Sequence, residues 1–216
     1  MRKLFIALAG LLATVCAGAA DNNPVLSIEG GKVQGVSTDI KGVTVFRGIP
    51  FAAPPTGQNR WKAPQPVIPW EGVKVCDTFG HPPFQAAHYT GGYPSEWGYG
   101  DEAPYSEDCL YLNVWTPAAG KTNAKLPVTL WIHGGGFSTG AGSAGPVDGA
   151  ELAKKGVVLI SINHRLDVLG FLDLSSFGGK WENSVNVGML DIVEALNRLS
   201  SCIYIIFCKK VAGQYD

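Results

Sequence analysis

The sequence predicts an α/β fold: an N-terminal β-hairpin region, then a mostly parallel central sheet flanked by helices. Two observations carry this prediction. From Cys109 onward, strand-like apolar segments alternate with segments whose apolar residues recur at helical spacing. The strand-like segments are also nearly continuous apolar runs, which is typical of parallel strands covered on both faces.

The first expected elements are strands. Residues 25–37 (VLSIEGGKVQGVS) alternate around a Gly-Gly pair, which predicts a hairpin. Residues 42–55 (GVTVFRGIPFAAPP) predict a strand that runs into a proline-rich loop. Residues 63–105 are rich in proline, glycine and aromatic residues with little periodicity, and such long irregular segments are usually functional or packed by their own side chains. The aromatic residues are expected either to line a pocket or to fill a small core of the loop.

The central elements follow in order. Strands are expected in residues 109–117 (CLYLNVWTP), 126–133 (LPVTLWIH) and at the start of 157–172 (VVLISINHRLDVLGFL). Helices are expected in residues 148–156 (DGAELAKKG) and 186–199, where Val187, Leu190, Val193 and Leu196 share helical spacing.

Composition narrows the classes of function. The chain has 216 residues, of which 46% are hydrophobic and 16% charged, and its net charge is −1. These values fit a soluble globular protein with a substantial core. The near-neutral charge gives no electrostatic footprint for nucleic acid, so no nucleic-acid partner is expected.

The N-terminus has the pattern of a cleavable signal peptide. Arg2 and Lys3 precede an apolar stretch at residues 4–15, and small residues follow at 17–20. Residues 1–20 are therefore expected to direct the protein out of the cytoplasm, to a secreted or periplasmic location. The apolar stretch is too short for a spanning helix, so no integral membrane span is expected. A lipid anchor at Cys16 is the weaker alternative.

A glycine-rich segment directly after an expected strand carries the strongest chemical signal. It reads His133-Gly134-Gly135-Gly136, and loops at the carboxyl ends of strands are where α/β proteins bind ligands. Because these glycines have no Cβ, the amides of Gly135 and Gly136 can approach one carbonyl oxygen and stabilise negative charge on it. This pattern is described for the oxyanion hole of lipases and esterases.

Two rival motifs overlap the following segment. Residues 140–145 match G-x-G-x-x-G, with Asp167 downstream, but no strand runs straight into the first glycine as a dinucleotide site requires. Residues 141–145 resemble a nucleophile elbow around Ser143, yet again no strand leads into it, which favours a loop serine. No cofactor is expected. No metal is expected either, because Cys202 and Cys208 lack metal-ligand spacing.

Five longer segments extend the pattern along most of the chain. They are residues 46–66 (FRGIPFAAPPTGQNRWKAPQP), 106–117 (SEDCLYLNVWTP), 131–142 (WIHGGGFSTGAG), 162–172 (INHRLDVLGFL) and 186–196 (NVGMLDIVEAL). In content and order they resemble the N-terminal part of the type-B carboxylesterases, the cholinesterase-like branch of the α/β-hydrolases. The resemblance implies an incomplete α/β-hydrolase fold and, for a completed protein, a small-molecule ester substrate.

The resemblance also assigns roles to individual residues. It implies an oxyanion hole at Gly135 and Gly136, with Gly134 shaping the turn. It implies two structural ion pairs, Arg60 with Glu107 and Arg165 with Asp191; the alternative is that all four side chains are solvated. His133 and His164 are expected to be structural, and His164 stands where the family usually has tyrosine.

A disulfide is the least defined feature. Cys109 matches the cysteine of the family's Ser-Glu-Asp-Cys motif, and Cys76 is the candidate partner, although it lies several residues before the family's position. The other pairings among Cys76, Cys109, Cys202 and Cys208 stay open.

After Leu196 the sequence departs from the family. Residues 197–216 contain no Gly-x-Ser-x-Gly, and Tyr215 stands where the serine would be. Residues 202–208 (CIYIIFC) are expected to form a short strand, which would be an exposed edge if unpaired. We therefore divide the chain into a signal at 1–20, an esterase-like part at 21–196 and a divergent tail at 197–216. Nucleophile, acid and base are absent, so a truncated serine esterase, inactive alone, is expected; a secreted binding or adhesion member, or a non-functional fragment, is the alternative. The ester and the oligomeric state stay open.

Overall fold

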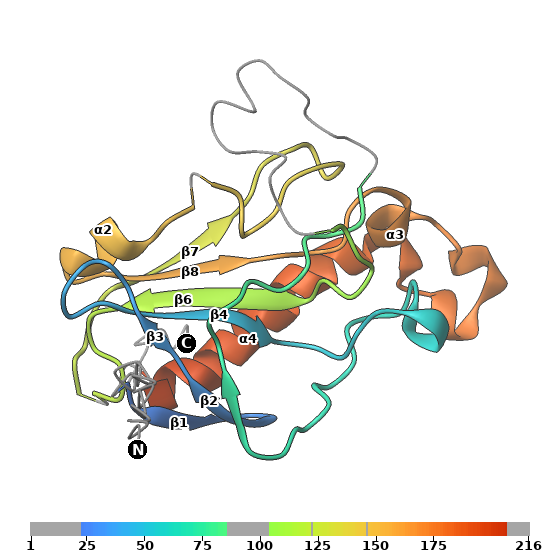
Figure 1. The fold of residues 1–216 in the computed structure, drawn as a ribbon. Helices are drawn as coiled ribbons and strands as arrows, with labels where there is room; N and C mark the ends of the chain where they lie inside the picture. The colour runs from blue at the N-terminus through green and yellow to red at the C-terminus, as the bar shows by residue number, and fades with distance from the viewer. Residues whose placement is uncertain (1–22, 86–103, 122, 146, 207–216) are drawn as a thin grey trace, which may run out of the picture.

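The computed structural model describes residues 23–85, 104–121, 123–145 and 147–206, with side chains to residue 199. The expected signal peptide, residues 86–103 of the aromatic segment and residues 207–216 of the tail lie outside the described residues. Figure 1 shows a central sheet with a long helix along one side and a small second sheet near the N-terminus.

The predicted N-terminal hairpin is confirmed. Strand β1 (Val25–Ile28) pairs antiparallel with β2 (Gly31–Gln34), and Gly30 turns between them at a φ of 101°. A Cβ on Gly30 would lie 2.5 Å from the ring of Trp70, so this turn requires glycine. Strand β5 (Val73–Val75) pairs parallel with β2 and completes this sheet.

The second sheet has five strands in the order β3-β4-β6-β8-β7. They are β3 (Val36–Ser37), β4 (Thr44–Pro50), β6 (Tyr111–Thr116), β7 (Val128–Ile132) and β8 (Val158–Ile162). The α/β class is confirmed, but this sheet is mixed: in the described residues only β7 and β8 run parallel, and the other pairs are antiparallel. The difference arises because β3, β4 and β6 pair antiparallel in series, and β6 also pairs antiparallel with β8.

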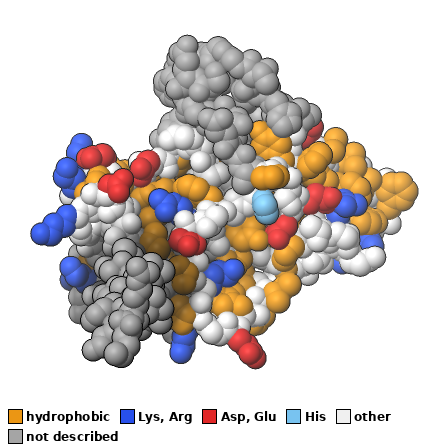
Figure 2. All heavy atoms as spheres, in the orientation of Figure 1, with side chains coloured by type: hydrophobic (Ala, Val, Ile, Leu, Met, Phe, Trp, Pro, Cys, Tyr) orange, Lys and Arg blue, Asp and Glu red, His pale blue; other side chains and the backbone are white. Residues whose placement is uncertain are grey.

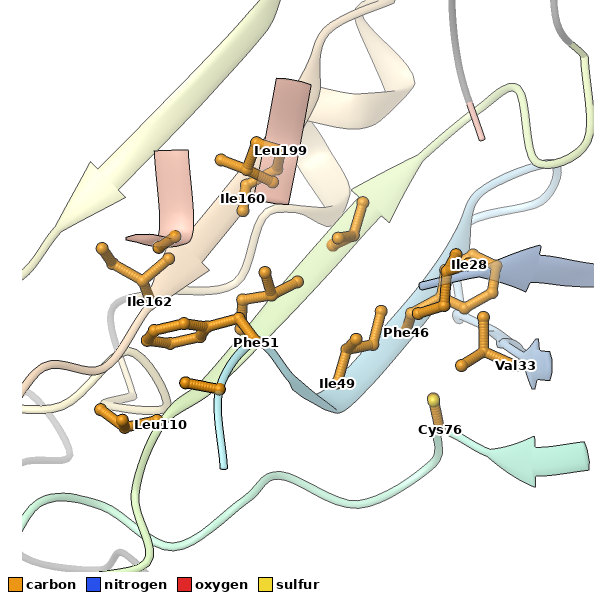
Figure 3. Close-up of a cluster of buried hydrophobic side chains, with 14 of the residues drawn as sticks. Ile28, Val33, Phe46, Ile49, Phe51, Cys76, Leu110, Ile160, Ile162 and Leu199 are labelled. Atoms are coloured by element: carbon orange, nitrogen blue, oxygen red, sulfur yellow. The ribbon is translucent and has the colours of Figure 1, made fainter. Parts of the chain in front are cut away.

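Helices cover both faces of this sheet. Helix α4 (Val187–Ile206) places Ile192, Ala195 and Leu199 in a core cluster with Ile160 and other β8 residues, as Figure 3 shows for Leu199 and Ile160. Helix α2 (Ala150–Lys154) packs on the other face, in a cluster that contains Leu159. All five β8 residues are buried, as expected for a strand covered on both faces.

Short helical segments connect these elements. Helix α3 (Asp167–Phe171) follows β8, and the 3-10 turns are η1 (Gly57–Asn59), η2 (Ser175–Phe177), η3 (Gly179–Trp181) and η4 (Ser184–Asn186). Figure 2 shows hydrophobic side chains gathered on the end of the molecule that carries α3 and the last three turns. Among the described residues, no helix has both the length and the hydrophobicity to cross a bilayer.

The prediction of a strand in residues 202–208 is wrong for residues 202–206, the part that the structure describes. Residues 202–206 continue α4, which ends at Ile206. A helix that has already begun gains one backbone hydrogen bond for each residue added. That gain outweighs the weak preference of isoleucine for strands, which is below about 1 kcal/mol per residue.

Candidate active site

The glycine loop begins where β7 ends, at the carboxyl end of the parallel β7–β8 pair. Gly135, Gly136 and Phe137 all have left-handed φ angles, of 117°, 61° and 63°. A Cβ on Gly135 would lie 2.1 Å from the backbone oxygen of Thr139, so only glycine fits there. A Cβ on Gly136 would meet no atom, and its requirement for glycine is the backbone angle alone.

The glycines of this loop are exposed, and two of their N–H groups are unbonded within the described residues. Gly134, Gly135 and Gly136 are exposed, and no described acceptor binds the N–H of Gly135 or Gly136. The loop closes through the carbonyl of Gly135, which accepts from the N–H groups of Ser138 at 3.1 Å and Thr139 at 3.2 Å. Each of these two N–H groups could therefore bind an acceptor without displacing a protein hydrogen bond.

Polar side chains from distant segments hold the chain just after the loop. Gln85 binds Gly140 twice: its Oε1 accepts the Gly140 N–H at 2.9 Å, and its Nε2 donates to the Gly140 carbonyl at 3.0 Å. Gly142 donates to Oδ1 of Asn163 at 2.7 Å, and its carbonyl accepts from the Ser161 hydroxyl at 2.7 Å. A Cβ on Gly142 would lie 2.7 Å from the Ile162 carbonyl oxygen, so this segment packs directly on β8.

The structure supports neither of the two rival motifs, the G-x-G-x-x-G pattern at residues 140–145 and the elbow-like pattern around Ser143. Ser143 Oγ is buried with no hydrogen-bond partner among the described residues, so no base activates it there. The amides of Gly140 and Gly142 are already bonded to Gln85 and Asn163 and are not offered to a phosphate. Helix α2 starts only at Ala150, which leaves no strand–turn–helix around either motif.

His133 and His164 lie together under the loop. Nδ1 of His133 is 2.9 Å from the Gly134 carbonyl oxygen, and the two imidazole rings stack with centroids 4.5 Å apart. Burial, and then the neighbouring His164, lower the pKa of His133 to about 4. Neither ring bonds a described serine, which agrees with the structural roles expected of them.

The structure brings both expected ion pairs together. Arg60 donates from Nε and Nη2 to the two carboxylate oxygens of Glu107, at 2.6 Å each, and both side chains are partly exposed. The hydrogen bond and the charge of Glu107 raise the pKa of Arg60. A small pocket with several apolar residues, including Phe84, lies between this pair and Arg165 and does not reach the glycine loop.

The second ion pair is deeply buried. Arg165 and Asp191 are 3% and 0% exposed, and Nε, Nη2 and the backbone N–H of Arg165 all donate to the Asp191 carboxylate at 2.7–2.9 Å. Burial raises the pKa of Asp191, while the bonds and charge of Arg165 oppose that shift. The pair joins the exit of β8 to α4.

The candidate disulfide is not formed in this structure. Cys76 and Cys109 are both free and buried. Hydrogen bonds hold the backbone of Cys76 between Gln34 and Arg47, at 2.8 Å each, so its side chain fills the core beside β2 and β4. Burial raises the pKa of Cys76 to about 12 and that of Cys109 well above its ordinary value. The described residues contain no cluster of potential metal ligands.

A mixed sheet with helices on both faces, and a glycine loop at the carboxyl end of a parallel strand, fit the class of α/β-hydrolases, to which the similar solved structures belong. The model of the carboxylesterase family matches residues 22–204, and the chain belongs to that family.

Individual relatives agree with this assignment. Fumonisin B1 esterase of Sphingopyxis macrogoltabida is 38% identical over 84% of this chain, and para-nitrobenzyl esterase of Bacillus subtilis is 40% identical over 80%. Carboxylesterase EST55 of Geobacillus stearothermophilus superposes with a TM-score of 0.71 at 38% identity, over 84% of this chain and 35% of that structure. An esterase of Clostridium hathewayi that can hydrolyse aliphatic aromatic polyesters superposes with a TM-score of 0.75 at 35% identity, over 84% and 35% of the two chains. The chain spans about a third of the curated relatives, 32% and 33% of the first two.

Proposed function

We propose that this chain supplies the oxyanion-stabilising loop of a carboxylic-ester hydrolase that acts through an acyl-enzyme. A serine hydroxyl attacks the ester carbonyl, a base takes the hydroxyl proton, and the carbonyl oxygen becomes an anion. The N–H groups of Gly135 and Gly136 bind that oxygen. The intermediate then expels the alcohol, which takes up the proton, and water later hydrolyses the acyl-enzyme.

One observation carries this proposal. Gly135 and Gly136 are exposed, left-handed in φ and unbonded at their N–H groups within the described residues, at the carboxyl end of β7. Donors fixed before the reaction need no reorganisation when negative charge develops. Removing one such donor typically lowers kcat about 10²–10³-fold.

The experiment is a chimera in which residues 22–204 replace the matching third of para-nitrobenzyl esterase from Bacillus subtilis. We expect Gly136→Ala to lower kcat for a nitrophenyl ester about 10²-fold, because the new Cβ disfavours the left-handed loop and displaces the amide. Gly178→Ala is the matched control: its φ is 66° and its Cβ would also meet no atom, but it lies at turn η2. Equal losses of kcat in the two variants would contradict the proposal.

We further propose that this chain alone does not turn over esters. No described serine is hydrogen-bonded to a histidine, and Ser143 Oγ has no partner among the described residues. The purified 216-residue chain should show no ester hydrolysis above background. A rate that disappears in Ser143→Ala would show that this serine is a nucleophile after all.

Export is the last part of the proposal. Residues 1–20 have the charge, apolar and small-residue regions of a signal peptide. Expressed with these residues, the protein should be found outside the cytoplasm with a new N-terminus near Asp21; without them it should stay inside. Recovery of the uncleaved chain in the cytoplasm would refute this assignment.

A further inference from the structure

Two buried imidazoles stack at the base of the glycine loop. The rings of His133 and His164 are 4.5 Å apart between centroids and only 3° from parallel. They are 8% and 2% exposed. His133 directly follows β7. His164 is the second residue after β8, with Asn163 between them. The parallel pairing of β7 with β8 therefore brings the two rings together.

Hydrogen bonds fix the tautomer of each ring. Nδ1 of His133 lies 2.9 Å from the Gly134 carbonyl oxygen, and Nδ1 of His164 lies 3.0 Å from the Arg165 carbonyl oxygen. A carbonyl only accepts, so each Nδ1 carries the proton and each Nε2 carries the lone pair. Nε2 of His133 is buried without a partner among the described residues. A proton added there would create a buried donor that no described group accepts, which opposes the charged form.

The stack is connected to both ends of the glycine loop. His133 holds the first glycine through the Gly134 carbonyl. At the other end, Phe137 meets His164 edge-on at 6.3 Å between centroids and packs on Phe171 at 5.1 Å. Gly140 leaves room for the His133 ring, because a Cβ there would lie 2.3 Å from Nδ1.

Charged groups near the stack do not favour a charged ring. Arg165 follows His164, but the carboxylate of Asp191 on α4 neutralises it. Asp167 at the start of α3 is exposed, and its backbone N–H binds the Phe137 carbonyl at 2.8 Å. Burial lowers the pKa of both rings, and His164 lowers that of His133 further.

We propose that the stacked His133–His164 pair is a positioning element for the Gly135 and Gly136 amides, and that it holds them only while both rings are neutral. The inference rests on the function proposed for these amides. Protonation of either ring places a charge against its neighbour in a buried stack. The stack then separates, and the loop loses its supports at Gly134 and Phe137.

The test is an NMR titration of the ¹⁵N-labelled 216-residue chain from about pH 8 to about pH 3, which passes the expected midpoint of His133. The ring nitrogens of His133 and His164 report tautomer and charge, and the amide signals of Gly135 and Gly136 report the loop. We expect both rings to be Nδ1–H tautomers at neutral pH. The two glycine signals should then move with the midpoint of His133, while amide signals of β8 stay in place.

Two variants sharpen the titration. His164→Tyr keeps a flat ring but cannot be protonated, so the midpoint of His133 should rise while the glycine signals keep their neutral-pH positions. His81→Gln is the control, because His81 is exposed and lies outside the stack; it should change neither midpoint nor glycine signals.

Three results would overturn the proposal. They are glycine signals that stay fixed while His133 titrates, global unfolding at a higher pH than the glycine shift, and His164→Tyr leaving the midpoint of His133 unchanged. None of these readouts needs a substrate, so the proposal can fail while ester hydrolysis by the chimera succeeds, and the reverse.

Discussion

Lowering the pH from about 7 to about 5 should weaken the fold through His133. In the folded chain its pKa is lowered from 6.5 to about 4, chiefly by burial. The unfolded state therefore binds this proton more readily than the folded state. The stability that neutral His133 contributes is complete above the unfolded pKa and is lost as the pH falls from 6.5 towards about 4.

The magnitude follows from the size of the shift. One pKa unit corresponds to about 1.36 kcal/mol, so the shift from 6.5 to about 4 is worth about 3 kcal/mol in full. Integration over the two titration curves puts about 2 kcal/mol of this loss between about pH 7 and about pH 5. This is a large part of the stability of an ordinary domain, which is roughly 5–15 kcal/mol.

Urea unfolding of wild type and His133→Asn at both pH values measures the effect. The asparagine amide can still donate to the Gly134 carbonyl but does not titrate in this range. Wild type should lose about 2 kcal/mol more unfolding free energy than the variant, because only wild type carries the titration of His133. Equal losses would refute the reasoning that burial keeps His133 neutral.

Three further predictions concern the core. Asp191→Asn should lower the unfolding free energy in urea by about 3–5 kcal/mol, because it leaves a buried guanidinium unpaired, whereas Glu107→Gln should cost about 1 kcal/mol or less at its more exposed pair; similar costs would contradict the difference in burial. Leu199→Ala, at a 5% exposed side chain, should cost about 2–5 kcal/mol, and Leu196→Ala, at 48%, should cost far less in the same assay. Peptide mapping after iodoacetamide should find Cys76 unmodified in the native chain and modified in urea, because burial raises its pKa to about 12; rapid native labelling would show that the thiol is accessible.

The sequence predicts elements whose causes are local. The turn at Gly30 requires a residue without Cβ, and the glycine pair signals it. Strand β5 was missed because its three residues owe their conformation to pairing with β2, about forty positions earlier. The place of β8 between β6 and β7 was missed for the same reason, since no local pattern states strand order. Residues 202–206 were misassigned because a short apolar run fits a strand or a buried helix equally well.

The residues of the candidate site also differ in whether the local sequence predicts them. Gly135 and Gly136 could be predicted as candidate site residues because bare backbone after a strand is itself a sequence signal. Gln85 had none, because it reaches Gly140 across 55 positions from an irregular segment. Ser161 and Asn163 did leave a signal: they are polar residues at a fully buried strand and its exit, where each must find a partner.

These contacts fix the position of the glycine loop against β8 and the residues that follow β8. Ser161 and Asn163 bind Gly142, His164 stacks on His133, and the backbone N–H of Asp167 binds the carbonyl at the end of the loop. Arg165, which also follows β8, forms an ion pair with Asp191 on α4. Every one of these groups belongs to the described chain. The amides at the carboxyl end of β7 therefore take their conformation from other residues of this chain, and the oxyanion-binding role proposed for them requires donors that are fixed before the reaction.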